Sequence, residues 1–267
     1  MRREDIPLYA LESGDPVCDF DFIGFTLQYE LSYTNVLNML ELAGIPLRSK
    51  DRTELHNIVV GAALRLQPRT PGGLLRHFLP GGRGRVDIEV MELYRQCKKE
   101  GKSKLEFLEQ AAQIQGVYVP AFYDVAYNED GTVKAYTPTH GASATVKKRN
   151  MMDMDKSYYP KDFVVPLIDV VHNRISEEVL RGCIRGCRFC QAGFLYRPYR
   201  EKSIETIDRQ CRDLCASTGY DEISLSSLST SDYGNLNELI DTLHQWTEGE
   251  KVSLSLPSLR VDNFSPS

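Results

Sequence analysis

Three cysteines in one short stretch constrain this chain more than any other feature of its sequence. Cys183, Cys187 and Cys190 follow one another with the spacing C-x3-C-x2-C, and Phe189 stands directly before the third. Thiolates spaced in this way can hold three corners of an iron–sulfur cube, which normally takes four cysteines. One iron of such a cube has no protein ligand. The spacing therefore predicts a [4Fe-4S] cluster with one open iron.

Two other uses of the cysteines compete with this prediction. A structural zinc site also uses C-x2-C, but a closed site needs four ligands, and the candidates for the fourth are His172, Cys211 and Cys215. Zinc therefore stays open as an alternative. Disulfides are disfavoured, because seven cysteines is an odd number and the three clustered ones cannot all pair. The first residues lack an apolar signal core, so we expect a reducing, cytoplasmic setting.

The residues around the cysteines resemble a known family. The run EEVLRGCIRGCRFCQAGFLYRP, residues 177–198, resembles the cluster loop of the radical S-adenosylmethionine (SAM) superfamily. The resemblance implies that the three cysteines bind the cluster and that SAM chelates the open iron through its amino and carboxylate groups. It further implies reductive cleavage of SAM to a 5′-deoxyadenosyl radical, which takes hydrogen from a substrate. The electron would come from an external donor such as flavodoxin or ferredoxin.

The C-terminal part of the sequence predicts the opening of a barrel. A strand over 176–181 leads into the cysteines, and a helix over 202–219 follows them. A strand over 221–228, a helix over 235–250 and a strand over 251–259 complete a βαβαβ run. In TIM-type barrels the chemistry takes place at the C-terminal ends of the strands. The cysteines follow such an end.

The ends of the second and third of these strands supply candidate SAM contacts. EISLSSLSTSDYG, residues 222–234, resembles the second-strand motif of radical enzymes of the methylthiotransferase type, and SLPSLRVD, residues 255–262, resembles their third-strand motif. The same resemblance places an aromatic side chain of the cysteine stretch against adenine. A serine-rich strand end can equally be a polar cap on a buried sheet, and no catalytic residue is assigned. The predicted cofactor-binding residues are Phe189, Ser227, Ser229, Asp232, Ser258 and Arg260.

The first 116 residues predict a second α/β unit. An apolar run over 20–27, helical spacing over 32–44 and a strand over 56–61 imply a parallel sheet with a crossover helix. GFTLQYELSYTNVLNML, residues 24–40, resembles the N-terminal region of a bacterial radical SAM family that is related to cobalamin-binding Rossmann-like domains. The Asp-x-His-x-x-Gly motif that supplies a histidine to cobalt does not occur in the sequence. We therefore expect a domain without cobalamin.

Residues 62–85 interrupt this pattern. They are rich in Arg and Gly, contain no acidic residue and show neither a 3.6-residue nor a two-residue period. Codons can be chosen for residues 64–77 that, read one base later, encode CAYNPEPLADFFD, which resembles the family's sequence at this point. We interpret the segment as the product of a local frameshift. This interpretation predicts an aberrant segment with no regular element.

The remaining stretches complete the predicted domain organisation. Helices are predicted over 89–101 and 103–116, a β-hairpin over 117–138, and a polar linker that runs into a strand over 164–172. The predicted fold class is α/β, with a Rossmann-like N-terminal part and the first three strands of a partial TIM-type barrel. Three strands do not close a barrel, so we expect this chain to turn over little or no SAM. The predicted domains are a Rossmann-like domain, 1–116, a hairpin and linker, 117–171, and a truncated radical SAM core, 172–267.

Composition limits the classes of partner. The net charge of −5 argues against a strongly basic nucleic-acid surface, so RNA is a candidate substrate through the resemblance alone. No run of about 18 apolar residues is present, and we expect no contact with a membrane. The predicted function is that of a radical SAM enzyme with an unidentified substrate. The alternative is a non-catalytic iron–sulfur or zinc-binding module.

Overall fold

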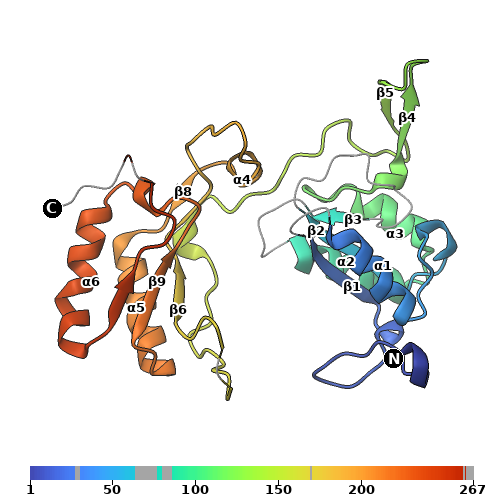
Figure 1. The fold of residues 1–267 in the computed structure, drawn as a ribbon. Helices are drawn as coiled ribbons and strands as arrows, with labels where there is room; N and C mark the ends of the chain where they lie inside the picture. Colours follow the sequence, from blue (N-terminus) through green and yellow to red (C-terminus); the bar gives the residue numbers. More distant parts are fainter. Residues whose placement is uncertain (28–30, 64–76, 80–85, 169, 261, 263–267) are drawn as a thin grey trace. The chain divides into compact units, whose positions relative to one another are not determined.

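The chain forms two compact units in the computed structural model, Met1–Asn150 and Met151–Ser267. Each unit has its own hydrophobic core and its own parallel sheet (Figure 1). The fold is thus mixed α/β, as predicted. The structure describes residues 1–27, 31–63, 77–79, 86–168, 170–260 and 262.

The first unit is built on a three-stranded parallel sheet in the order β1-β2-β3. Strand β1 (Phe22–Leu27) pairs with β2 (Ile58–Ala63), and β2 pairs with β3 (His77–Leu79). Helix α1 (Ser32–Leu42) connects β1 to β2 and buries Val36 and Leu40 in a core shared with β1. The predicted strand, helix and strand are therefore confirmed, with shifts of a few residues at their ends.

Strand β3 lies inside the segment for which no regular element was predicted. That expectation is wrong at His77–Leu79, because this stretch supplies a third strand parallel to β2. Most of the remaining segment, residues 64–76 and 80–85, lies outside the described residues. The frameshift interpretation itself remains a prediction.

Two helices cover this unit's larger core. Helix α2 (Val86–Lys99) and helix α3 (Lys104–Ala111) pack together, with Cys97 fully buried between them and the sheet. A capping box starts α3: the Ser103 hydroxyl accepts the Glu106 N–H at 3.3 Å, and the Glu106 carboxylate accepts the Ser103 N–H at 2.8 Å. These two bonds satisfy amide groups that have no partner within the helix.

The predicted hairpin is present as strands β4 (Tyr123–Tyr127) and β5 (Val133–Pro138). The residues leading into it, among them Val117 and Phe122, are buried in the same core as α2 and α3. The hairpin is therefore anchored on the first unit, and the division into units falls after Asn150. The sequence pattern suggested a separate segment because it could not show where these apolar side chains are buried.

A polar cluster links β1, β2 and α2 at the start of the sheet. The Asp21 carboxylate accepts hydrogen bonds from Tyr94 Oη at 2.7 Å and Lys98 Nζ at 2.9 Å, and lies 3.2 Å from His56 Nδ1. The hydrogen bond from Lys98, followed by that from Tyr94, lowers the pKa of Asp21 to about 2. The ionised carboxylate thus stabilises the folded first unit.

Replacing Asp21 with Asn should lower the free energy of unfolding by about 1 kcal/mol at pH 7, after allowing for solvent screening of a side chain that is 37 % exposed. Because the folded pKa lies below the ordinary value of 3.8, this stabilisation is complete above that pH and is lost as the pH falls towards 2. Denaturant titrations of both proteins at pH 7 and pH 2.5 measure the difference. A deficit that does not change with pH would contradict this assignment.

The second unit contains the βαβαβ run predicted from the sequence. Strand β6 (Ile175–Glu178), helix α5 (Ile204–Thr218), strand β9 (Glu222–Ser226), helix α6 (Leu236–Glu250) and strand β10 (Ser253–Ser255) follow in order. The strands are parallel and lie in the order β10-β9-β6. Sequential strands are thus neighbours, as at the opening of a barrel, and no closed barrel is seen in the described part of the chain.

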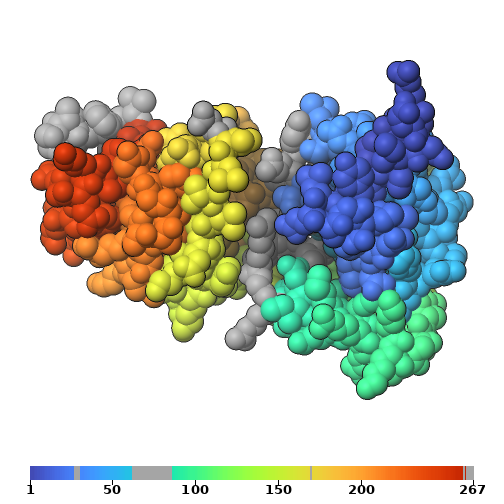
Figure 2. Space-filling view, turned by 90° about the horizontal axis from the view of Figure 1, so that it is seen from below, coloured from blue at the N-terminus to red at the C-terminus, as the bar shows by residue number. Residues whose placement is uncertain are grey.

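Helices α5 and α6 cover one face of this unit's sheet (Figure 1), and the space-filling view shows their orange and red surfaces side by side (Figure 2). Trp246 of α6 donates its indole N–H to Asp208 of α5 at 2.8 Å, and the Arg212 guanidinium lies 4.7 Å from the centre of the indole ring. The buried strand residues Ile223 and Leu225 point at the helices. The alternate residues, which include serines of all three strands, are on the opposite face.

The prediction of a strand over 164–172 is wrong. In the described part of this stretch no strand forms, and Val164, Leu167 and Val171 are 89 %, 104 % and 90 % exposed. Pro166 cannot donate a ladder hydrogen bond, so the apolar run does not pair despite its composition. None of the helices described is long and apolar enough to cross a membrane.

Candidate functional site

The carboxyl ends of the three parallel strands meet at one edge of the second unit's sheet. The chain leaves β6, passes through the short strand β7 (Leu180–Arg181), and returns through β8 (Arg200–Glu201), which pairs antiparallel with β7. Residues 182–199 between them form what we call the cysteine loop. The β7–β8 pair closes this loop at its stem, directly beyond the end of β6.

A buried ion pair reinforces the stem. Lys202 donates through Nζ to the Glu177 carboxylate and, at 2.8 Å, to Gln210 Oε1, and the two charged side chains are only 5 % and 4 % exposed. The Lys202 amide also donates to the Val179 carbonyl at 2.9 Å. Burial raises the pKa of Glu177, and Lys202 opposes that rise. The pair connects the strand that enters the loop to the chain that leaves it.

Gly182, the first residue of the cysteine loop, has no room for a side chain. Its φ is +94°, and a Cβ atom there would lie 2.7 Å from the Pro198 carbonyl oxygen and 2.9 Å from that of Tyr196. Both contacts are with backbone, which cannot move without opening the returning half of the loop. Glycine therefore sets the direction in which the chain enters the cysteines.

Replacing Gly182 with Ala should disrupt the loop, because strain at this φ adds to a backbone clash and together they cost about 1–3 kcal/mol or more. We expect a lower melting temperature and a several-fold loss of iron uptake. Gly186→Ala is the matched control, since a Cβ at Gly186 meets nothing within 4 Å. Equal iron uptake by the two variants would show that the contacts at Gly182 are unimportant.

The three cysteines are all half-buried and free. The Arg185 amide donates to Cys183 Sγ at 3.4 Å, and the Cys190 amide donates to the Cys187 carbonyl at 3.1 Å. A one-turn helix, α4 (Ala192–Leu195), follows the third cysteine. The loop thus presents three free thiols on one short stretch of chain, and cysteine sulfur is the usual ligand of an iron–sulfur cluster.

The spacing of these ligands bears on the kind of site. Among the described residues, no three His, Cys, Asp or Glu side chains are arranged around a single metal ion. In an iron–sulfur cube each cysteine binds a different iron, so its ligands stand farther apart than those of a single ion. The absence of a single-ion arrangement among the described residues is therefore compatible with a cluster on the three thiols.

The end of β9 approaches the cysteine loop through a polar network. Beyond β9 the Ser227 hydroxyl accepts the Ser229 N–H at 3.1 Å, and the Ser229 hydroxyl donates to Asp232 Oδ2 at 2.8 Å. The Asp232 carboxylate also accepts from Arg185 of the cysteine loop, with Nε at 3.1 Å and 3.0 Å from its two oxygens. Arg185 holds the pKa of Asp232 below its ordinary value. The carboxylate is therefore ionised at neutral pH.

The end of β10 joins the same network. Ser258, with a φ of +61°, accepts the Thr230 N–H at 3.3 Å through its carbonyl, and the Arg260 amide donates to Ser231 Oγ at 3.3 Å. Arg260 lies within electrostatic range of Cys187, and its Nε is buried with no hydrogen-bond partner in the described part of the chain. A buried donor of this kind is suited to an anionic ligand, because leaving it unpaired is unfavourable.

Phe189 is exposed to solvent, whereas the two cysteines of helix α5 are shielded from it. The Phe189 ring is 92 % exposed on the cysteine loop. Cys211 is fully buried against the sheet, and burial raises the pKa of both Cys211 and Cys215, that of Cys215 to about 11. His172 is exposed and lies 3.3 Å from Arg174. The two helix cysteines are thus protonated packing groups, which makes them poor candidates for a fourth zinc ligand.

Comparison with known families covers the same region. Residues 178–265, which include the three cysteines and the ends of β9 and β10, match the family described as the radical SAM superfamily. The chain belongs to the radical SAM superfamily. Residues 1–120 match the family described as radical SAM proteins, N-terminal. The predicted resemblance is confirmed for both units of this radical SAM protein.

A curated relative shows how the chain aligns with a longer protein. The uncharacterized protein MJ0966 of Methanocaldococcus jannaschii is 24 % identical over 272 residues, which cover 99 % of this chain and 50 % of MJ0966. The radical SAM chain therefore spans about half the length of the curated relative it matches.

Several residues of the site have no signal in the sequence. Gly182 could have been noticed as a glycine directly before the first cysteine, but its close contacts depend on how the loop returns. Arg185 pairs with a carboxylate 47 residues away. Glu177 and Lys202 look like ordinary surface charges in the sequence and are buried in the structure. A pattern of neighbouring residues cannot reveal such pairings.

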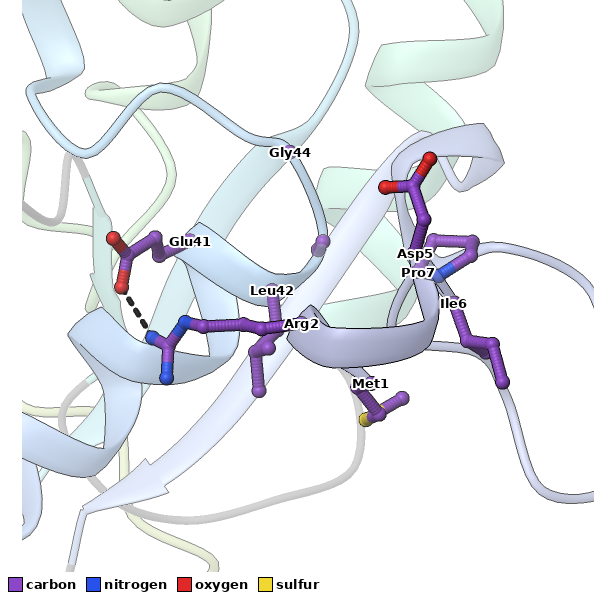
Figure 3. A pocket seen from close by; sticks show the side chains of 9 residues that line it. Met1, Arg2, Asp5, Ile6, Pro7, Glu41, Leu42 and Gly44 are labelled. Atoms are coloured by element: carbon purple, nitrogen blue, oxygen red, sulfur yellow. Dashed lines mark hydrogen bonds and ion pairs between the residues drawn. The ribbon is translucent and has the colours of Figure 1, made fainter.

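The first unit has a shallow pocket near its N-terminus (Figure 3). Its volume is about 540 Å³, and Arg2 and Glu41 face each other at its mouth at 2.5 Å. Both side chains are about 60 % exposed, so the pair contributes little and adds no buried polar group to the pocket. This pocket carries no functional assignment.

Proposed function

We propose that Cys183, Cys187 and Cys190 hold a [4Fe-4S] cluster whose fourth iron binds SAM, and that this site is part of an enzyme that generates a 5′-deoxyadenosyl radical. One observation carries the proposal: the C-x3-C-x2-C loop stands at the carboxyl end of β6, within the region that matches the superfamily. The strand ends beside it supply polar groups on the same edge of the sheet.

The residues present fit both groups. The Arg185 N–H donates to Cys183 Sγ at 3.4 Å, as an amide can also do to a cluster-bound thiolate, and Gly193 adds no side chain beside the Cys183 Cβ. For SAM, the unpaired Arg260 Nε offers a donor to a carboxylate. Ser227, Ser229 and Ser258 offer further polar contacts from the neighbouring strand ends, and the exposed Phe189 ring offers a surface for adenine.

When bound, the cluster and SAM supply one-electron cleavage of the sulfonium and hydrogen abstraction by the resulting radical. The protein groups have simpler tasks. The β7–β8 stem and the buried Glu177–Lys202 pair fix the loop that presents the three thiolates. Arg260 and the serines orient the methionine end of SAM. An external donor such as flavodoxin or ferredoxin delivers the electron.

Anaerobic reconstitution tests the proposal. The chain should take up about four irons and four sulfides and then bind one SAM, whereas the protein before reconstitution should bind none. Metal analysis, sulfide analysis and equilibrium dialysis with labelled SAM measure these numbers. Retention of one tightly held zinc with no iron would instead support a structural metal site. Four irons without SAM binding would support a cluster that only carries electrons.

A further inference from the structure

Arg185 stands between the first two cysteines of the loop, and its guanidinium pairs with Asp232 beyond β9. The contact is bidentate, with Nε and one terminal nitrogen both engaged by the carboxylate. This fork geometry fixes direction as well as distance, which a single point charge does not. Among the described residues, this ion pair links the cysteine loop to the chain that follows β9.

The two partners are buried to different degrees. The Asp232 side chain is 2 % exposed and that of Arg185 is 33 % exposed. Ser229 donates a further hydrogen bond to Asp232, so both carboxylate oxygens have donors. Removing Arg185 would take the bidentate cation from a carboxylate that is almost fully buried, whereas removing the charge of Asp232 would release a guanidinium that can reach water. Substitution of Arg185 is therefore expected to disturb the loop more than substitution of Asp232.

We propose that the Arg185–Asp232 pair is a positioning device, which holds the cysteine loop against the end of β9 before the cluster is assembled and keeps it there afterwards. The proposal rests on the proposed function, since the loop is taken to be the cluster loop. It changes the assignment made from the sequence, in which Asp232 contacts SAM. Asp232 instead acts through Arg185, and the three serines and Arg260 are left to contact SAM.

The first consequence concerns the protein without a cluster. If the pair holds the loop, Cys183, Cys187 and Cys190 should react slowly with iodoacetamide under anaerobic conditions, and Arg185→Gln should raise their rates about tenfold. Arg185→Lys keeps the charge but loses the fork, so it should give an intermediate rate. Asp232→Asn should raise the rates less than Arg185→Gln. Mass spectrometry of the full chain resolves the labelling of each cysteine.

Two further variants make this result specific. The double variant Arg185→Gln/Asp232→Asn should label no faster than Arg185→Gln, because both changes break one contact. Arg212→Gln is the matched control, since it removes a pair with Asp208 on helix α5, outside the loop. Wild-type labelling rates in Arg185→Gln would overturn the proposal. The proposal would also be overturned if the increase in labelling rate in the double variant equalled the product of the two single-variant increases.

The second consequence separates positioning from direct contact. After reconstitution, Asp232→Asn should still show a change in the electron paramagnetic resonance spectrum of its reduced cluster when SAM is added. Loss of that change, with labelling rates like those of the wild type, would show that Asp232 contacts SAM and would overturn the proposal. If the wild type takes up no iron, the proposed function fails, while the labelling rates still decide whether the pair holds the loop.

Discussion

Replacing Cys187 with Ala should abolish the cluster, lowering bound iron from about four per chain to nearly none. A cube with an open iron already relies on three protein ligands, and the loss of one leaves two thiolates on a loop that cannot supply another. Cys183→Ala and Cys190→Ala should have the same effect. Iron and sulfide analysis after reconstitution and desalting measures it, together with the visible absorption of the cluster.

Cys215→Ala is the matched control for this series. Cys215 is a half-buried cysteine on helix α5, outside the cysteine loop, and its removal disturbs packing less than removal of the fully buried Cys211. The control should bind the full complement of iron. If one of the three loop variants also kept it, that cysteine would not be a cluster ligand, and the assignment would have to include another group.

Replacing Lys202 with Met should cost about 3–5 kcal/mol of stability, because it leaves the Glu177 carboxylate buried without a counter-ion. The deficit should be larger at pH 8 than at pH 5. Protonation removes the buried charge, and the folded state of the variant binds that proton more tightly than the unfolded chain, so stability is lost as the pH rises. Denaturant titration of the full chain at both pH values measures the loss.

The double variant Glu177→Gln/Lys202→Met separates charge from packing. With no unpaired charge left, it should recover most of the stability lost in Lys202→Met. Its iron uptake should be close to that of the wild type, since the stem of the cysteine loop would be held in place. A double variant as unstable as the single one would show that Lys202 acts through its packing and through its bond to Gln210.

Local sequence patterns were enough to predict many of the helices and strands. The periodicity of α2, α5 and α6 and the alternation of the hairpin predicted these elements, because each depends on residues close together in the sequence. The spacing of the cysteines also identified the loop that matches the superfamily. Its place after β6 followed from the strand that precedes it.

Contacts between distant residues could not be predicted in this way. The run over 164–172 has strand composition, yet its described residues find no strand partner. In contrast, His77–Leu79 lies in a segment with no period and pairs with β2. Asp232 was selected for its motif, whereas its bond to Arg185 depends on how two loops meet at the edge of the sheet. Each of these outcomes was decided by tertiary neighbours.

The most direct test of the radical SAM assignment is the electron paramagnetic resonance spectrum of the reconstituted, dithionite-reduced protein, recorded before and after SAM is added. Three cysteine ligands leave one iron open, so SAM should bind that iron and change the g values of the reduced [4Fe-4S] cluster. A fully assembled cluster whose spectrum is the same with and without SAM would contradict the assignment, since no iron of the cluster would then bind SAM.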